Sequence, residues 1–378
     1  MHNTNNHQMR KIDFGLGYSN TPLHKNINQE IISNIQNIQP YNDDKNLSHI
    51  YTNTSGLDIL KTAIIKKLLT SHKKQYQLNE LIICNGARAA IFNYLLAIKN
   101  MHSNKSIQAH LIIPYWHTYK SILQILNITY QEHTKIENIQ LNDDNINIIC
   151  LINPGNPDGK ICSYNELSYL VNLMNLQKNT YVISDEVYSD IIFDNQKHLS
   201  IASMCNQDLQ QQFIVINSFS KTNEISGWRI GYGISHHTVI KEMNNIQKAT
   251  CANVSNLSQY AALAAINNEH LYLTNNIASY EAKRNLIIEK LNKYFTIYKP
   301  QAGLFILIGL PNNINCDKFC DFMLNKYNVT ILSGNLFKIP NVFRLCFARN
   351  KHDLIEGCER LIDAIQQFKT KKNLTIIK

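Results

Sequence analysis

Residues 218 to 232 have the sequence Ser218-Phe-Ser-Lys-Thr-Asn-Glu-Ile-Ser-Gly-Trp-Arg-Ile-Gly-Tyr232. The sequence on either side of Lys221 in this stretch indicates the fold of the whole chain. Two short apolar runs, Phe213 to Asn217 and Ile230 to Ile234, flank the lysine at position 221 and have the character of buried strands. Loops that follow the strands of an open α/β sheet carry its ligand-binding groups. Lys221 is therefore predicted to lie in a ligand-binding loop at the edge of a sheet.

The same kind of apolar run recurs upstream, and amphipathic segments of helical length separate the runs. Because strands and helices in turn build a mainly parallel sheet with helices on both faces, we predict an α/β fold. The predicted strands are Leu81–Cys84, His110–Ile113, Ile146–Ile152 and Thr180–Ser184, and the predicted helices are Leu57–Thr70, Ala87–Ile98, Tyr119–Leu126 and Ser163–Leu176.

The pattern changes after about residue 284, where strands and helices suggest a smaller α+β domain. A separate helix, Asn28 to Ile38, precedes the main alternation. We predict a large domain at residues 42–283 and a small domain formed by residues 13–41 and 284–378, with the active site between them. The elements predicted for the C-terminal part are a helix to Lys293, strands Leu304–Leu310 and Phe343–Ala348, and helices Asp317–Tyr327 and Asp353–Phe368.

Polar and glycine-rich segments follow five of the predicted strands. Carboxyl ends of parallel strands meet at one edge of a sheet, and helix N-termini there offer free N–H donors. We therefore expect these segments to form one site. They are Asn85–Arg88, Pro114–Trp116, Asn153–Gly159, Asp185–Tyr188 and Ser218–Lys221.

Three of the motifs, residues 218–232, Asn153-Pro-Gly-Asn-Pro-Asp-Gly159 and Ser184-Asp-Glu-Val-Tyr188, resemble those of the class I and II aminotransferases, which are fold-type I pyridoxal-phosphate enzymes. The resemblance extends from about Gly17 to Arg344, with the motifs in the family's order. It implies a fold-type I transferase with pyridoxal 5′-phosphate as cofactor. It further implies transfer of the α-amino group of an L-amino acid to a 2-oxo acid.

The resemblance gives three residues catalytic roles on the cofactor. Lys221 matches the Schiff-base lysine; an aldehyde cofactor needs such an amine, and the amine must be neutral to react. Asp185 would keep the ring nitrogen protonated, because a buried carboxylate can hold a proton there. Tyr188, with Asn156, would donate to the phenolic oxygen of the cofactor. Asp185 as a helix cap and Asn156 as a turn residue remain the structural alternatives.

The resemblance also assigns a phosphate site, a ring contact and a subunit contact. Arg229 supplies a charge-assisted anchor for the phosphate. Trp116 would stack on the cofactor ring, although a simply packed tryptophan is the alternative. Tyr51 matches a tyrosine that reaches the phosphate of a neighbouring subunit, which implies a homodimer. The remaining phosphate contacts are the hydroxyls of Ser218 and Ser220 and the N–H groups of Gly86, Ala87 and Arg88.

The substrate carboxylate is expected to pair with Arg344, because the guanidinium fork fits a carboxylate plane. Gly17 matches a glycine that approaches the same group. The chain departs from the family pattern where Tyr18-Ser19-Asn20 follows Gly17 in place of an acidic residue and proline, and where Asp158 replaces threonine. The identity of the amino donor therefore stays open, with Arg88, His117 and Tyr18 as candidates for contacting its side chain.

Other functions remain to be weighed against aminotransfer. A pyridoxal-phosphate-dependent carbon–sulfur β-lyase is the main alternative, and decarboxylases and oxidases use the same scaffold. A ligand-sensing regulator would carry a DNA-binding helix-turn-helix, for which no room is expected before Gly17. A nicotinamide dehydrogenase would need Gly-x-Gly-x-x-Gly after an early strand, and Gly15-Leu-Gly17 lacks the third glycine.

The composition of the chain bears on which partners the protein binds and where in the cell it is found. The net charge of +9 comes from scattered lysines, so we expect no nucleic-acid partner. Nine cysteines without a C-x-x-C pair predict no metal site. No run reaches the roughly 18 apolar residues of a membrane span, and the start, Met1 to Arg10, is polar. We therefore expect a cytoplasmic protein without membrane association.

Overall fold

The computed structural model describes residues 9–20, 22–36, 50–311 and 314–375. Its main feature is a seven-stranded sheet in the order β2-β8-β7-β6-β5-β3-β4. Strands β7, β6, β5, β3 and β4 are parallel, while β8 runs antiparallel to both of its neighbours. The predicted mainly parallel sheet is confirmed. The strands are β2 Leu81–Cys84, β3 Ile107–Ile112, β4 Thr129–His133, β5 Ile146–Ile152, β6 Thr180–Asp185, β7 Phe213–Ser218 and β8 Gly231–Ile234.

Helices cover both faces of this sheet, which explains why its central strands β5, β6 and β7 are buried and mainly apolar. Successive residues of β2 show the alternation: Ile83 packs in the core beneath one set of helices, and Ile82 packs in the core beneath the other. The first face carries α2 Asp58–His72, α5 Tyr164–Leu176 and α7 Asn256–Asn267, and the second carries α3 Ala87–Met101, α4 Thr118–Ile125 and α6 His237–Thr250.

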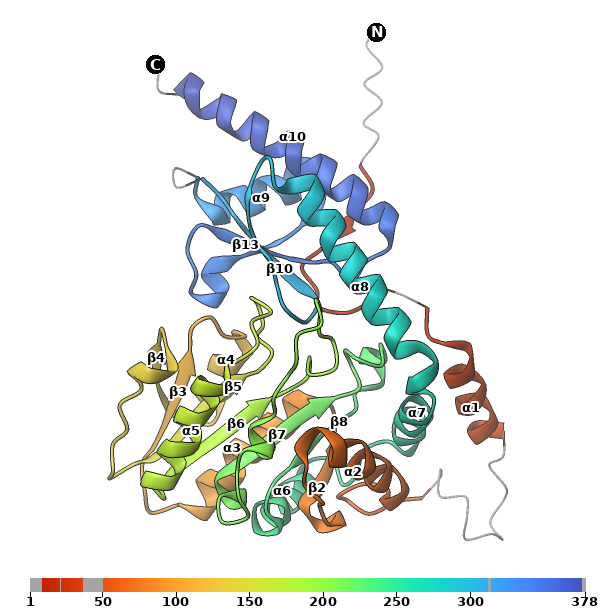
Figure 1. Cartoon of the computed structure of the whole chain (residues 1–378), viewed down its shortest axis with the longest axis vertical. Coiled ribbons are helices and arrows are strands. Elements are labelled where there is room, and N and C mark those ends of the chain that lie inside the picture. Colours follow the sequence, from red (N-terminus) through yellow and green to blue (C-terminus); the bar gives the residue numbers. More distant parts are fainter. Residues whose placement is uncertain (1–8, 21, 37–49, 312–313, 376–378) are drawn as a thin grey trace.

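A smaller antiparallel sheet, in the order β12-β13-β10-β9, lies beyond the carboxyl ends of the large sheet's parallel strands (Figure 1). The long helix α8, Glu269–Leu291, extends from the large sheet's helices to the small sheet. The other elements here are β9 Thr296–Tyr298, β10 Phe305–Gly309, α9 Cys316–Tyr327, β12 Leu332–Ser333, β13 Val342–Cys346 and α10 Lys351–Thr375.

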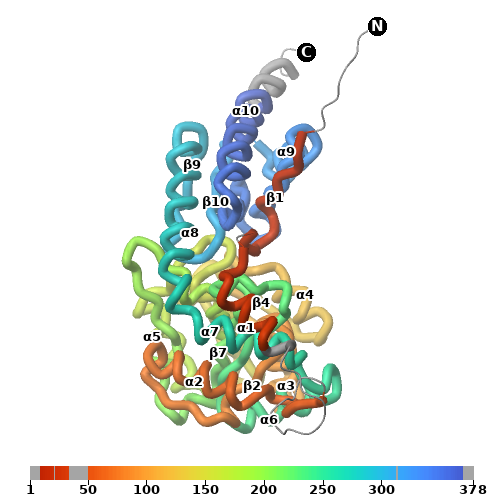
Figure 2. Tube along the Cα trace, turned by 90° about the vertical axis from the view of Figure 1, so that its right-hand side faces the viewer, coloured from red at the N-terminus to blue at the C-terminus, as the bar shows by residue number. Residues whose placement is uncertain are grey.

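The N-terminal segment contacts both parts of the molecule (Figure 2). Its strand β1, Ile12–Asp13, pairs in parallel with β11, Val329–Thr330, beside the small sheet. Its helix α1, Lys25–Gln36, places Ile27 in the core of the large sheet. Gly15, Leu16 and Gly17, which follow β1, lie where the site was expected. The domain limits 13–41, 42–283 and 284–378 stay a prediction.

None of the helices in the described part of the chain combines the length and the apolar character needed to cross a membrane.

Candidate active site

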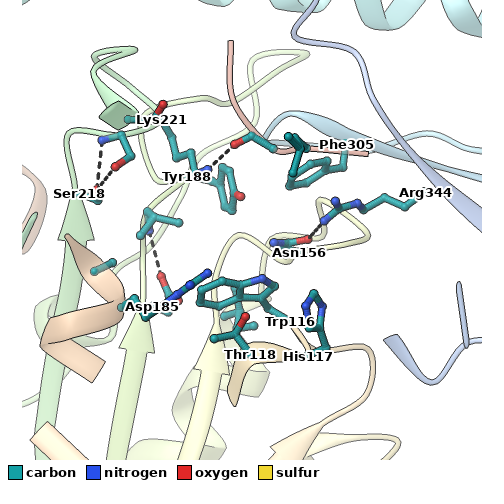
Figure 3. A pocket seen from close by; sticks show the side chains of 18 of the residues that line it. Trp116, His117, Thr118, Asn156, Asp185, Tyr188, Ser218, Lys221, Phe305 and Arg344 are labelled. Atoms are coloured by element: carbon teal, nitrogen blue, oxygen red, sulfur yellow. Dashed lines mark hydrogen bonds between the residues drawn. The ribbon is translucent and has the colours of Figure 1, made fainter. Parts of the chain in front are cut away.

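A cavity of about 360 Å³ lies at the carboxyl ends of the parallel strands, and Phe305, Leu332 and Arg344 of the small sheet form part of its lining. Figure 3 shows Asp185, Tyr188 and Lys221 on one side of this cavity, and Arg344 with Asn156 on the other. Twelve of the predicted site residues line it. They are Gly17, Ala87, Arg88, Trp116, Asn156, Asp185, Tyr188, Ser218, Ser220, Lys221, Arg229 and Arg344.

Asp185 is the last residue of β6, and its carboxylate is buried at the floor of the cavity. Burial raises the pKa of Asp185 to about 6, because the charged form loses its water. Two hydrogen bonds act in the opposite direction: the Tyr119 hydroxyl donates to Oδ2 at 3.3 Å, and the Val187 N–H donates to Oδ1 at 3.4 Å. Such a carboxylate can hold a proton on a basic nitrogen brought next to it.

Lys221 lies in the loop after β7, and its Nζ donates to the carbonyl oxygen of Gly17. Burial lowers the pKa of Lys221 to about 8, and the positive charge of Arg344 acts in the same direction. The neutral amine is therefore accessible near physiological pH, unlike that of an ordinary surface lysine. A neutral buried amine can act as a nucleophile or carry a proton.

A group of anion-binding donors lies beside Lys221. Ser218 Oγ lies 2.8 Å from Ser220 Oγ, and Arg229 Nη1 donates to the carbonyl oxygen of Ser226 at 2.8 Å. Gly86 precedes α3 with φ +81°, and a Cβ at this position would lie 2.8 Å from Arg229 Nη2. The guanidinium is therefore packed against the backbone at the start of a 15-residue helix. This arrangement suits a phosphate group.

Arg344 projects from β13 between two aromatic rings, with Cζ 3.9 Å from the centroid of Phe305 and 4.8 Å from that of Phe337. Its Nη1 donates to Asn156 Oδ1 at 2.8 Å, and its Nη2 donates to the carbonyl oxygen of Gly15 at 2.6 Å. Its buried Nε has no hydrogen-bond partner among the described residues. A buried, unsatisfied guanidinium donor beside a cavity favours an anionic ligand there.

Trp116, His117 and Thr118 line the cavity together, in the lower part of the view in Figure 3. Arg88 Cζ lies 5.0 Å from the centroid of the Trp116 ring. Burial lowers the pKa of His117, and the charges of Arg344 and Arg88 lower it further, so the neutral imidazole is favoured. A flat ring, a guanidinium and an imidazole thus face the same space.

The residues fit the expected cofactor, pyridoxal phosphate, on three observations. The buried carboxylate of Asp185 suits a protonated ring nitrogen. The close approach of Arg229 to Gly86, where a Cβ would lie 2.8 Å from Nη2, suits a phosphate at the helix start. The buried amine of Lys221 suits an aldehyde.

Four residues singled out by sequence lie away from the cavity lining: Gly86, Tyr51, Asp158 and Tyr18, whose carbonyl oxygen accepts from Arg349. Gly86 borders it through Arg229. Tyr51 is 85% exposed and does not line the cavity of its own chain. Asp158 borders a separate, smaller cavity and accepts from the Lys160 N–H at 3.3 Å, which agrees with a turn role.

Several site residues escaped sequence reasoning. Tyr119 reaches Asp185 from α4, and no motif marks it. Phe305 and Phe337 sandwich Arg344, but in the sequence they are ordinary apolar residues of the small domain. Their aromatic spacing gives no local signal, because the contacts arise only when the small sheet folds. The other lining residues outside the predicted segments and site residues are Gly15, Leu16, Thr118, Ile152, Ser226 and Leu332.

The sequence model for "Aminotransferase class I and II" matches residues 11–361. Among curated proteins, the chain is 27% identical to a probable aspartate/prephenate aminotransferase of Rickettsia felis, covering 86% of this chain and 84% of that protein. It is 28% identical to an aspartate aminotransferase of Bacillus sp. strain YM-2, covering 82% of each. The crystal structure of Thermotoga maritima aspartate aminotransferase superposes with a TM-score of 0.83 at 24% identity, over 94% of this chain and 92% of that one.

Proposed function

The chain belongs to the class I and II aminotransferases, and from that premise we propose which of its residues carry the reaction. It is an aminotransferase that uses pyridoxal phosphate and acts on amino acids and 2-oxo acids. When bound, the cofactor supplies an electron sink that makes the Cα–H of an attached amino acid acidic. The assignment of residues rests on one observation: Lys221, Asp185 and Arg344 line a single cavity.

Lys221 is the residue that we assign to cofactor attachment and to proton transfer at the substrate Cα. Its low pKa leaves the amine neutral for a large part of the time near pH 8, so it can accept and return a proton. Asp185 holds a proton on the ring nitrogen, and the Tyr119 hydroxyl fixes its orientation. Tyr188 and Asn156 are assigned to the phenolic oxygen of the ring.

The phosphate is assigned to Arg229, Ser218, Ser220 and the N–H groups that open α3. Trp116 is assigned to the face of the cofactor ring. Arg344 binds the substrate carboxylate, and the hydrogen bond to Asn156 together with the flanking rings limits its rotation. Gly17 is assigned to the same carboxylate. It lines the cavity, and a Cβ there would lie 2.4 Å from Phe305 Cζ, so a larger residue would disturb this wall.

The proposed amino donor is acidic, with aspartate as the first candidate. Both curated relatives carry aspartate in their names. Arg88 supports this choice, because its guanidinium stands over Trp116 beside the cavity and forms no ion pair with a described carboxylate. A second guanidinium opposite Arg344 would bind the distal carboxylate of such a substrate.

The proposed assembly is a homodimer in which Tyr51 reaches the phosphate of the neighbouring subunit. Its support is the position of Tyr51, which is 85% exposed and does not line the cavity of its own chain, so its hydroxyl is accessible to another subunit. A cytoplasmic location is proposed because the start of the sequence is polar and no apolar run is long enough to span a membrane.

The test is a substrate panel assayed with the cofactor-loaded protein. Aspartate with 2-oxoglutarate should give a kcat/KM at least 10 times that of alanine or phenylalanine, and Arg88→Gln should cut the aspartate value by roughly 10-fold to 100-fold, because a charged hydrogen bond is lost. Equal rates for acidic and neutral donors would contradict the acidic-donor proposal. Release of pyruvate with ammonia or sulfide, without amino transfer, would favour the carbon–sulfur lyase.

A further inference from the structure

Arg349 lies three residues beyond β13, and its buried side chain is directed at the N-terminal segment. Its Nε donates to the carbonyl oxygen of Asp13 at 2.6 Å, and its Nη2 donates to that of Leu16 at 2.6 Å. Its Nη1 donates to the carbonyl oxygens of Tyr18 and, at 3.1 Å, Ala348. Its Cζ also lies 4.6 Å from the centroid of the Tyr18 ring. One guanidinium thus binds three carbonyl groups of a six-residue segment.

The chemistry of this contact is unusual for a buried arginine. Buried arginines are normally paired with a carboxylate, whereas Arg349 forms no ion pair with any described residue. Its charge is balanced by backbone carbonyl dipoles instead. A guanidinium has donors in a rigid fork, so it can fix several carbonyl groups in one relative geometry, which an ammonium group cannot do.

The segment that Arg349 holds is a wall of the active site. Gly15, Leu16 and Gly17 line the cavity. The carbonyl oxygen of Gly15 accepts from Arg344 Nη2 at 2.6 Å, and that of Gly17 accepts from Lys221 Nζ. The position of this short segment therefore sets the surroundings of both the proposed carboxylate-binding group and the proposed cofactor-binding group.

We propose that Arg349 is a positioning residue for the amino-acid substrate: it fixes the segment from Asp13 to Tyr18 so that the Gly15 carbonyl orients Arg344 and the Gly17 backbone faces the substrate carboxylate. This inference rests on the proposed role of Arg344. It predicts a defect in substrate binding with the cofactor affinity preserved. Arg349 contacts none of the groups assigned to the phosphate or the ring, and the Lys221 amine, which the segment contacts only through the Gly17 carbonyl, would be joined to the cofactor in the loaded protein.

Arg360 offers a matched control in the same part of the molecule. Its Nη1 also binds carbonyl groups, those of Arg10 at 2.8 Å and Tyr327 at 2.7 Å, and so ties the chain's start to the small domain. It does not line the cavity or touch the segment from Asp13 to Tyr18. If Arg349 only stabilises the fold, Arg349→Gln and Arg360→Gln should behave alike.

The experiment compares Arg349→Gln, Arg349→Lys and Arg360→Gln as cofactor-loaded proteins. Arg349→Gln should raise the KM for the amino acid and for the oxo acid on the order of 10-fold, with kcat within about threefold and the cofactor Kd within about twofold. Arg349→Lys should have KM values between those of Arg349→Gln and the wild type, because the ammonium group keeps the charge but lacks the forked donors of the guanidinium. Arg360→Gln should leave both KM values within about twofold of the wild type.

A second readout does not depend on activity. Hydrogen exchange of the amides from Gly15 to Tyr18 should be faster in Arg349→Lys than in wild type, with no matching change in β6 or β7. Because this measurement uses Arg349→Lys, it tests the positioning role even if Arg349→Gln fails to fold. Unchanged exchange, or a KM equal to the wild-type value beside a lowered unfolding midpoint, would overturn the positioning role.

Arg344→Gln, measured in parallel, distinguishes a failure of the proposed carboxylate site at Arg344 from a failure of the positioning role of Arg349. If Arg344→Gln leaves the amino-acid KM unchanged, the proposed carboxylate site is wrong. If Arg344→Gln raises that KM and Arg349→Gln does not, only the positioning role is wrong.

Discussion

Arg344 on the small sheet donates from Nη1 to Oδ1 of Asn156, 2.8 Å away in the loop after β5. This one hydrogen bond joins the two parts of the molecule across the cavity. It also orients the guanidinium, whose Nε remains without a partner in the described part of the chain. The geometry gives a substrate carboxylate a ready donor at the point where the small sheet meets the large one.

Replacing Arg344 with lysine should cost catalysis although the charge is kept. The ammonium group cannot bind Asn156, Gly15 and a carboxylate in one plane, so roughly 1.5 to 3 kcal/mol of charged hydrogen bonding is lost. The expected result is a fall in kcat/KM of about 10-fold to 100-fold, mostly in KM, measured by steady-state kinetics. Activity within threefold of the wild type would show that a bidentate group is not needed.

Replacing Tyr119 with phenylalanine should move a pH profile. The Tyr119 hydrogen bond lowers the pKa of Asp185, so its removal leaves burial less opposed and raises that pKa above its value of about 6. Only the ionised carboxylate pairs with a protonated ring nitrogen. The acid limb of cofactor affinity should therefore shift to higher pH by roughly half a unit to one unit.

Tyr94→Phe is the control for that shift. The Tyr94 hydroxyl is buried as well, but it has no hydrogen-bond partner among the described residues. Its removal should leave the profile in place and should not lower the unfolding midpoint. A profile that moves equally in both variants would mean that Tyr119 acts through packing.

The rate of cofactor attachment should report the pKa of Lys221. Only the neutral amine reacts with an aldehyde, and burial lowers the pKa of Lys221 to about 8. In the cofactor-free protein the attachment rate should therefore rise about tenfold per pH unit below pH 8 and level off above it. Stopped-flow absorption measures this rate. An inflection near the ordinary lysine value, about 10.4, would contradict the buried-amine assignment.

Gly86→Ala should weaken cofactor binding more than a neighbouring glycine substitution does. The new Cβ would lie 2.8 Å from Arg229 Nη2, and the residue has φ +81°, so about 1 to 2 kcal/mol of strain and a displaced guanidinium are expected. Gly227→Ala is the control, since no atom lies within 4 Å of its Cβ position. Cofactor titration followed by fluorescence should show a Kd at least fivefold higher for Gly86→Ala, and equal Kd values would count against the proposed phosphate site.

The sequence predicted best the elements that are buried on both faces. Strands β2 and β5 begin and end where the apolar runs do, at Leu81–Cys84 and Ile146–Ile152. Strand β4, Thr129–His133, was missed because it lies at the sheet edge with every residue at least partly exposed, so its residues are polar. The apolar-run criterion detects burial, and an edge strand has little.

Among the site residues, too, some were predicted from the sequence and others were missed. Asp185 and Lys221 follow strands, so sheet topology alone predicted that they would meet. Tyr119 and Arg349 carried no such signal. Arg349 meets Asp13 across 336 residues of sequence, through backbone carbonyl groups that exist at every position. Contacts of this kind depend on how the small domain folds over the large sheet, which no local pattern encodes.

Lys221 is proposed to carry the cofactor, and borohydride reduction of the loaded protein followed by peptide mass spectrometry is the most direct test of this role. Reduction makes the lysine–cofactor linkage permanent. The predicted result is a pyridoxyl phosphate group on the peptide that contains Lys221, and its absence from Lys221→Ala treated in the same way. A modification found on another lysine, or on none, would contradict the assignment.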